Sequence, residues 1–235
     1  MIDREKLYKY AKELGLELDD NMLSQFRLYA SELITTNKKY NLTAITEPDD
    51  IIVKHFIDSL TVLKYFDLDY GTKIIDIGSG AGFPTLPLLI AKNGMLKATF
   101  VDSVRKKLLF IESALKVCGL RGEIIHARAE ELSRNKKYRE RFDVATARAV
   151  APLNVLCELC IPFVKKGGYF IALKGQNDEC DLAENAIKQL GGAIESVVSY
   201  KLPNGDARSM VIIKKISQTP TVYPRKYKNI SAKPL

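Results

Sequence analysis

An apolar run that leads directly into a glycine-rich loop is the feature that most constrains the fold of this chain. The run at 74–77 contains one carboxylate, Asp76, and the loop that follows it carries Gly78, Gly80 and Gly82. Glycine permits a sharp turn and lets the backbone approach a ligand closely, because it has no Cβ. The pattern therefore predicts a buried strand followed by a loop that holds a nucleoside cofactor.

The spacing of this loop separates two classes of cofactor. It is G-x-G-x-G, whereas a dinucleotide site would have its third glycine where Phe83 stands. A pyrophosphate does not favour a carboxylate at Asp76, but a cationic sulfonium compound with a free amino group does. The loop therefore favours S-adenosylmethionine as the cofactor.

An alternation of apolar strands and helices begins at residue 73. Strands are expected at 73–77, 98–102, 123–127, 142–147, 168–173, 193–201 and 207–215. Strands that alternate with helices form a parallel sheet, and two strands around a Pro-Asn-Gly turn form an antiparallel hairpin. We expect a class I, Rossmann-like methyltransferase domain of the α/β class: a doubly wound sheet, mostly parallel, with a late antiparallel hairpin.

Three amphipathic helices are expected before the glycine loop. The first lies between Asp3, which can cap it, and Gly15, which can end it. The second places Phe26 on its apolar face and the third does the same with Phe56. The expected organisation is a helical extension over residues 1–66, a methyltransferase domain over 67–216 and a basic tail over 217–235.

The charge of the chain favours a polyanionic partner. The formal net charge is +8, and the stretch 214–235 holds six basic residues and no acidic one. The alternative is a solvated surface with a frayed tail. A charged N-terminus and the lack of any run of about 20 apolar residues argue against a signal peptide and a membrane span. We expect a soluble, cytoplasmic protein.

The four cysteines do not form a convincing metal site. Cys157 and Cys160 make a C-x-x-C pair, but a zinc site needs a second pair and the chain has only two histidines. Both cysteines also follow the spacing of an apolar helix face. We expect thiols packed in the core, and no bound metal.

Polar residues at the ends of strands are the first candidates for a site, because ligands lie beyond the carboxyl ends of the strands in a doubly wound sheet. Asp102 ends the second strand, where it can accept hydrogen bonds from ribose hydroxyls or cap the next helix. Ala129 and Glu130 follow the third strand and can flank adenine. Arg148 follows the fourth strand in an apolar stretch; because an unpaired buried guanidinium is costly, it should meet an acidic side chain or a nucleic-acid phosphate.

The third helix carries a second group of polar residues. His55 and Asp58 are neighbours on the face opposite Phe56, because residues three apart lie side by side on a helix. A lone histidine on a helix can be purely structural. Alternatively, His55 and Asp58, together with Asn41, form one wall of the active cleft.

The residues that are absent help to define the methyl acceptor. The Asn/Asp-Pro-Pro-aromatic loop typical of exocyclic amine methylation is replaced by Thr-Ala-Arg-Ala at 146–149, and no cysteine nucleophile for pyrimidine carbon methylation stands at that end of the sheet. A ring nitrogen with a lone pair needs no base to attack a sulfonium methyl group. Positioning and desolvation can then supply most of the catalysis.

Six segments carry a more specific signal. They lie at 37–43, 55–60, 76–84, 128–131, 147–149 and 173–175. Together they resemble the ribosomal RNA small subunit methyltransferase G family, also called glucose-inhibited division protein B. The helix motif His-x-x-Asp-Ser-Leu, combined with the arginine after the fourth strand, is the specific part of the match.

This resemblance implies methyl transfer from S-adenosylmethionine to N7 of one guanine in 16S (small-subunit) ribosomal RNA, near the decoding site. It implies cofactor contacts at Gly78, Phe83, Ala129, Glu130 and Arg148, with Asp102 on the ribose. It implies that Asn41, His55, Lys174 and Arg208 lie on the RNA side. The chain departs from the family pattern at Thr36, Thr85, Lys228 and Ile230, where tryptophan, glycine, glycine and proline are usual.

Two other functions are compatible with parts of the sequence. One is a small-molecule methyltransferase, which should be indifferent to deletion of residues 217–235, whereas an RNA enzyme should lose affinity for its polyanion. The other is a noncatalytic RNA-binding module on a methyltransferase fold. The intact glycine loop and Asp102 argue against this second alternative, because a lapsed cofactor site has no physical need of them.

Overall fold

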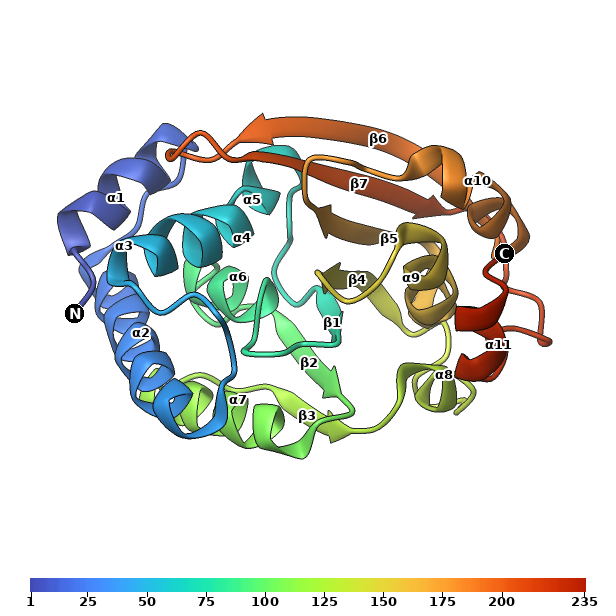
Figure 1. Cartoon of the computed structure of the whole chain (residues 1–235), viewed down its shortest axis with the longest axis horizontal. Coiled ribbons are helices and arrows are strands. Elements are labelled where there is room, and N and C mark those ends of the chain that lie inside the picture. The colour runs from blue at the N-terminus through green and yellow to red at the C-terminus, as the bar shows by residue number, and fades with distance from the viewer.

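The centre of the molecule is a seven-stranded sheet with the strand order β3-β2-β1-β4-β5-β7-β6 (Figure 1). The strands are β1 (Lys73–Ile77), β2 (Lys97–Asp102), β3 (Glu123–His126), β4 (Phe142–Arg148), β5 (Val164–Lys174), β6 (Gly192–Lys201) and β7 (Ala207–Lys215). The first five strands pair in parallel, and β7 pairs antiparallel with β5 and β6. This computed structural model covers residues 1–235 and confirms the predicted sheet.

The order of the strands places a crevice at the middle of the sheet. The chain runs outward from β1 through β2 to β3 and then returns to β4 on the other side of β1. The connections after β1 and β4 therefore leave the sheet in opposite directions. A ligand site is expected where they separate, at the carboxyl ends of these strands.

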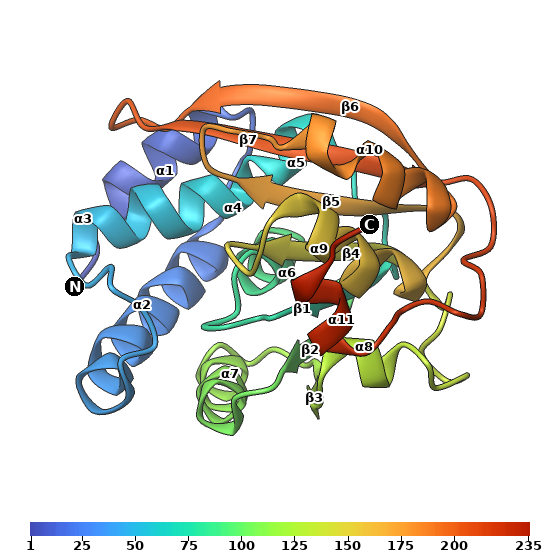
Figure 2. The same ribbon diagram turned by 45° about the vertical axis from the view of Figure 1, so that its right-hand side comes forward.

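Helices cover both faces of the sheet (Figures 1 and 2). They are α1 (Arg4–Glu13), α2 (Asp20–Tyr40), α3 (Pro48–Asp50), α4 (Asp58–Leu60), α5 (Val62–Tyr65), α6 (Thr85–Ala91), α7 (Arg105–Val117), α8 (Ala129–Leu132), α9 (Leu153–Cys160), α10 (Cys180–Gln189) and α11 (Tyr227–Ala232). A π-helical segment, η1 (Ile51–Ile57), and a 3-10 turn, η2 (Ile161–Phe163), complete the set. None of these helices is long and apolar enough to span a membrane.

Alternating side chains of the strands build two cores, one on each face of the sheet. On β1, Ile74 packs with the N-terminal helices, α6 and α7, whereas Ile75 and Ile77 pack with α9 and α10. The helices of residues 1–66 thus share one core with α6 and α7. The sulfur atoms of Cys157 and Cys160 are free thiols buried in the other core, as predicted.

The capping pattern predicted for the first helix is confirmed. α1 begins after Asp3, whose carboxylate accepts hydrogen bonds from the backbone amides of Glu5 and Lys6 at 2.9 and 3.1 Å. These are two of the amides that have no partner inside the helix.

The third helical segment is buried on the side of Phe56, and its polar residues His55 and Asp58 are buried as well. Part of the segment, Ile51–Ile57, is π-helical. The segment is also enclosed on a second side, where Tyr200 of β6 contacts Asp58. Polar side chains therefore meet protein on both sides of this helix.

The C-terminal residues fold back onto the domain. The side chain of Arg225 binds the fully buried carboxylate of Glu158 on α9, and Ile230 of α11 is buried in the core beneath it. Figure 1 shows α11 beside α8 and α9, with the C-terminus near α10. The basic stretch is therefore packed against the domain and is not a frayed tail.

Candidate active site

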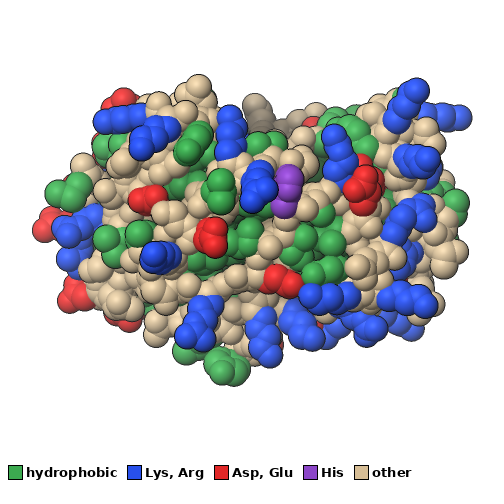
Figure 3. Space-filling model, turned by 90° about the horizontal axis from the view of Figure 1, so that it is seen from below, with side chains coloured by type: hydrophobic (Ala, Val, Ile, Leu, Met, Phe, Trp, Pro, Cys, Tyr) green, Lys and Arg blue, Asp and Glu red, His purple; other side chains and the backbone are tan.

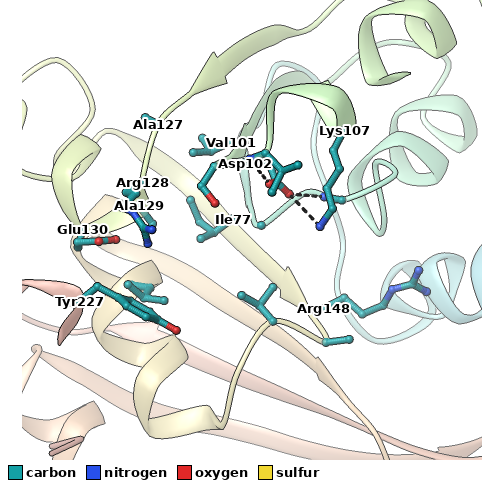
Figure 4. A pocket seen from close by; sticks show the side chains of 17 residues that line it. Ile77, Val101, Asp102, Lys107, Ala127, Arg128, Ala129, Glu130, Arg148 and Tyr227 are labelled. Carbon is teal, nitrogen blue, oxygen red and sulfur yellow. Dashed lines mark hydrogen bonds and ion pairs between the residues drawn. The ribbon is translucent and has the colours of Figure 1, made fainter. Parts of the chain in front are cut away.

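A cavity of about 390 Å³ opens at the carboxyl ends of β1, β2, β3 and β4 (Figure 4). Its walls are Ile77, Gly78, Gly80, Val101, Asp102, Ser103, Val104, Lys107, Ala127, Arg128, Ala129, Glu130, Arg148, Ala149, Val150, Leu159 and Tyr227. We call it the cofactor cavity. Among the residues predicted for the cofactor, Gly78, Gly80, Asp102, Ala129, Glu130 and Arg148 line it.

The glycines of the loop occupy positions that side chains would not tolerate. Gly78 and Gly80 have φ angles of 67° and 57°, in the left-handed region. A Cβ on Gly78 would lie 2.7 Å from Cγ2 of Val150, which also lines the cavity. Glycine at position 78 therefore lets the loop pack directly against Val150.

The Asp102 carboxylate ties the loop to the end of β2. Its Oδ2 accepts a hydrogen bond from the Gly80 amide at 3.0 Å, and its Oδ1 accepts one from the Val104 amide at 2.8 Å. Lys107 Nζ lies 3.8 Å from Oδ2. Each carboxylate oxygen can accept a second hydrogen bond. Asp102 binds the backbone just before α7 and does not cap that helix, whose N-cap residue is Val104 and has no side-chain cap. Its oxygens can still accept ribose hydroxyls.

Three residues predicted for the cofactor lie behind the cavity wall. Asp76 is fully buried; its Oδ1 accepts a hydrogen bond from Thr146 at 3.1 Å, and its Oδ2 has no partner. Burial raises the pKa of Asp76 to about 8, although the Thr146 hydrogen bond opposes this shift. A Cβ on Gly82 would lie 3.0 Å from the Tyr29 hydroxyl oxygen. Phe83 is also buried.

Arg148 is held in a network of buried polar groups. Its Nη1 donates to Asp58 Oδ2 at 3.0 Å and to the Lys54 carbonyl at 3.1 Å. Its guanidinium carbon lies 4.7 Å from the centre of the Phe83 ring. The Arg148 side chain is 14% exposed and that of Asp58 is 5% exposed. The anion that Arg148 required is therefore the carboxylate of Asp58.

The protonation state of His55 follows from its neighbours. Arg148 Nη2 lies 2.9 Å from His55 Nδ1, and because a guanidinium can only donate, Nδ1 must be the acceptor. The hydrogen of the neutral ring is then on Nε2, 3.1 Å from the Thr43 hydroxyl oxygen. Burial, followed by the Arg148 charge, lowers the pKa of His55 to about 3. The ring also stacks on Phe83 with centroids 4.2 Å apart. His55 is therefore a neutral residue that orients Arg148.

A second cavity of about 430 Å³ lies on the other side of Arg148. Its walls are Thr43, Ala44, Ile45, Lys54, His55, Asp58, Arg148, Ala149, Leu173, Lys174, Gly175 and Arg208. We call it the acceptor cavity. Arg148 and Ala149 belong to the walls of both cavities, so the two cavities are neighbours at these residues.

The predicted RNA-side residues are only partly brought together. His55, Lys174 and Arg208 line the acceptor cavity, but Asn41 does not. Asn41 is the exposed, left-handed residue that ends α2, with a φ angle of 48°. The segment that follows α2 is held instead by Asn37, whose side chain makes two hydrogen bonds of 2.9 Å with the backbone of Thr43.

Three functional candidates were missed from the sequence. Tyr200 donates to Asp58 Oδ1 at 2.9 Å from a strand 142 residues away, and no local pattern marks it. Tyr29 on α2 donates to the Ala81 carbonyl beneath the glycine loop. Tyr227 lines the cofactor cavity from the C-terminal helix. Each of these contacts depends on tertiary packing. The only local signal is that Tyr29 lies three residues after Phe26 on α2, which indicates a core position for Tyr29.

Positive charge surrounds the openings of both cavities. Lys174 and Arg208 line the acceptor cavity, and Arg128 and Lys107 line the cofactor cavity. The face that lies below α7, β3 and α8 in Figure 1 shows Lys and Arg side chains gathered toward one edge (Figure 3). Exposed bases near the cavity include Arg105, Lys106, Lys226 and Lys228. Such a surface favours polyanions.

Comparison with known protein families gives a match over most of the chain. A family model described as rRNA small subunit methyltransferase G matches residues 22–209. The chain is 47% identical to the ribosomal RNA small subunit methyltransferase G of Thermoanaerobacter sp. (strain X514), over 98% of each protein. It is 46% identical to the protein of the same name from Lactobacillus acidophilus, over 94% of each.

Comparison with solved structures supports the fold. The chain is similar to an S-adenosylmethionine-dependent O-methyltransferase from Thermotoga maritima, with a TM-score of 0.53 and 18% sequence identity, over 80% of this chain and 72% of that one. Identity at this level supports the class I methyltransferase architecture and not a particular methyl acceptor.

Proposed function

Because the chain belongs to the rRNA small subunit methyltransferase G family, we propose that it transfers the methyl group of S-adenosylmethionine to N7 of a guanine in 16S ribosomal RNA, near the decoding site. The observation that carries this proposal is the pair of neighbouring cavities that share Arg148 and Ala149 as wall residues. One has the features of a cofactor site, and the other is lined by basic side chains.

The residues of the cofactor cavity fit S-adenosylmethionine, which supplies a methyl group on a positively charged sulfur. The cavity volume of about 390 Å³ is within the range of small-ligand sites. Asp102 has acceptor capacity left for the ribose, and Ala129 and Glu130 lie where the adenine is expected. The unpartnered Oδ2 of Asp76 is buried behind the loop, and a cationic ligand bound nearby would favour the ionised form of this carboxyl group.

The residues of the acceptor cavity suit an RNA nucleotide. Lys174 is 10% exposed and is held by Glu179 Oε2 and the Ala151 carbonyl at 2.9 and 3.1 Å. Arg208 is 24% exposed, and its Nε lies 4.0 Å from Asp58. These fixed cations can contact the phosphates that flank a base inserted beside Arg148. Phosphate contacts of this kind make binding depend steeply on salt.

The chemistry of the site favours a ring nitrogen as the methyl acceptor. N7 of guanine attacks with a lone pair and releases no proton, so no general base is required. His55 is neutral, and both of its ring nitrogens already have partners. Cys157 and Cys160 are fully buried, and burial raises the pKa of each thiol, so neither can act as a nucleophile toward a pyrimidine carbon. The chain's contribution is therefore positioning and exclusion of water.

We propose further that the RNA is presented within a ribosomal particle in the cytoplasm. Figure 3 shows many Lys and Arg side chains gathered toward one edge of this face, and exposed bases such as Arg105, Lys106, Lys226 and Lys228 add to those that line the cavities. A folded RNA surface with several phosphates would engage these bases.

The test of the proposed function is methyl transfer from isotopically labelled S-adenosylmethionine to small ribosomal subunits from cells that lack the modification. Nucleoside mass spectrometry of the RNA should show label as 7-methylguanosine. Label in another nucleoside would reject N7 of guanine as the acceptor. Loss of labelling with Arg148→Met, in a variant that still binds the cofactor, would support methyl transfer beside the wall that the two cavities share.

A further inference from the structure

We propose that the C-terminal helix α11 completes the cofactor cavity, and that the ring of Tyr227 is the wall against which the adenine of S-adenosylmethionine lies. This inference rests on the proposed function, because it assigns one more contact in the same cofactor site. It gives residues 217–235 a role in holding the cofactor, in addition to the polyanion-binding role that their exposed bases indicate.

The segment before Tyr227 is fixed by a buried ion pair. Glu158 on α9 has no exposed surface, and its carboxylate accepts hydrogen bonds from the Arg225 side chain, at 3.0 Å from Nε and 2.6 Å from Nη2. The backbone amide of Arg225 also donates to it, at 2.7 Å. A bidentate contact of this kind is geometrically specific. Because Arg225 is two residues before Tyr227, the entry to α11 has one defined position.

Two arginines of the segment after α8 hold the preceding part of the tail. Arg139 donates to the carbonyls of Thr219 and Tyr223, both at 2.9 Å. Arg134 donates to the carbonyls of Val222 and Pro224. These four carbonyls belong to a stretch without regular secondary structure, so side chains replace the missing backbone partners. The tail is thus attached to the domain from Thr219 to Arg225.

The position of Tyr227 follows from this attachment. Figure 4 shows its side chain near Glu130 and Ala129, across the cavity from Asp102 and Lys107, with the hydroxyl end directed into the open space. The Arg128 guanidinium carbon lies 5.7 Å from the centre of the Tyr227 ring. Leu159, next to the anchoring Glu158, lines the same cavity. One short helix, α9, therefore supplies both a wall of the cavity and the anchor of the tail.

The neighbours of Tyr227 identify its ligand as the adenine of the cofactor. Ala129 and Glu130, which lie near its ring, follow β3, whereas Asp102, which is placed for the ribose, ends β2. The acceptor cavity lies on the far side of Arg148 and does not include Tyr227. Every nucleobase presents a flat π face, and an aromatic side chain stacks on it without requiring a particular hydrogen-bond pattern. Tyr227 as a whole is 41% exposed and lines the cavity, so part of its surface is accessible to a ligand there.

Calorimetry with S-adenosylhomocysteine, in the absence of RNA, tests the contact. Tyr227→Ala should weaken binding about five- to tenfold, the low end of what a stacked base contributes. Tyr227→Phe should stay within about twofold of the wild type. Tyr70→Ala is the matched control, because Tyr70 is an 84% exposed tyrosine outside both cavities. Binding by Tyr227→Ala that equals binding by the control would overturn the proposal.

A fluorescence measurement locates the contact on the cofactor. The chain has no tryptophan, so Tyr227→Trp introduces a single tryptophan reporter. Adenosine should quench its emission and methionine should not, because only adenosine carries the base. Unchanged emission at saturating adenosine, with binding confirmed by calorimetry, would exclude stacking at position 227. Quenching by small-subunit RNA alone would instead assign the residue to RNA.

Failure of this inference can be distinguished from failure of the proposed function. If the wild-type protein does not bind S-adenosylhomocysteine at all, the cofactor site itself is wrong. If the wild type binds and Asp102→Ala weakens binding while Tyr227→Ala does not, the site stands and only the role of α11 is rejected.

Discussion

Replacing Asp58 with asparagine should destabilise the protein by about 3 kcal/mol, through the loss of one charge. Asp58 is 5% exposed and accepts hydrogen bonds from Arg148 at 3.0 Å and from Tyr200 at 2.9 Å. Asparagine keeps one acceptor oxygen, so Tyr200 can keep its bond, but the amide cannot neutralise the buried guanidinium.

The size of this destabilisation depends on the partners that Arg148 retains after the substitution. Removing one partner of a buried ion pair typically costs about 3–5 kcal/mol. Arg148 keeps the Lys54 carbonyl, the His55 ring and 14% exposure, so we expect the lower end. In a domain of this size, about 3 kcal/mol corresponds to a fall in Tm of about 6–12 °C.

Urea denaturation of matched variants measures this effect. Asp67→Asn is the control, because Asp67 also pairs with a lysine at 3.0 Å but its side chain is 84% exposed. The control should unfold like the wild type. The double variant Asp58→Leu with Arg148→Met should recover much of the loss, since it removes both buried charges. A cost below about 1 kcal/mol for Asp58→Asn would refute the reasoning.

Three further predictions concern the site. Asp102→Ala should weaken S-adenosylhomocysteine binding by about 1–3 kcal/mol in calorimetry, because charge-assisted hydrogen bonds to the ribose are lost; unchanged affinity would reject that role. The pH profile of kcat should show no limb near 6.5 from His55, whose pKa is about 3, and a limb that disappears in His55→Gln would contradict this assignment. Because burial raises the pKa of Asp76 from 3.8 to about 8, the folded protein without ligand binds one more proton than the unfolded chain at pH values between these two pKa values. Wild-type stability should therefore fall relative to Asp76→Asn as the pH rises from 5 to 8, and an equal difference in urea at both pH values would argue against the shift.

The glycine loop and Asp102 could be predicted from sequence because their roles are local. A strand, a turn with left-handed glycines and a carboxylate at the end of the next strand are encoded within about thirty residues, and the topology of a doubly wound sheet then brings them together. The strand limits were predicted to within a few residues for the same reason: alternation and turn residues are short-range signals.

The arrangement around Arg148 could only be predicted in part. Its need for an anion followed from burial, but the choice between a carboxylate and a phosphate depended on packing between segments about ninety residues apart. The π-helical segment that carries His55 also has no signature in the 3.6-residue pattern.

The tail shows why charge composition is a weak guide to a surface. Lys215 is 1% exposed and pairs with Glu140 at 3.1 Å, and Arg225 pairs with the buried Glu158. Two bases of the acid-free stretch are therefore neutralised by acids from earlier in the chain. Deleting residues 217–235 would leave the Glu158 carboxylate buried without a partner, so this deletion cannot separate an RNA enzyme from a small-molecule enzyme. Substitution of exposed bases such as Lys226 and Lys228 is the cleaner test.

The most direct test of the two-cavity account is a crystal structure with S-adenosylhomocysteine and guanosine monophosphate bound together. The account predicts S-adenosylhomocysteine in the cofactor cavity with its sulfur toward Arg148 and Ala149. It predicts the guanine in the acceptor cavity with N7 facing that sulfur. Guanosine monophosphate bound elsewhere, or with N7 turned away from the sulfur, would contradict it.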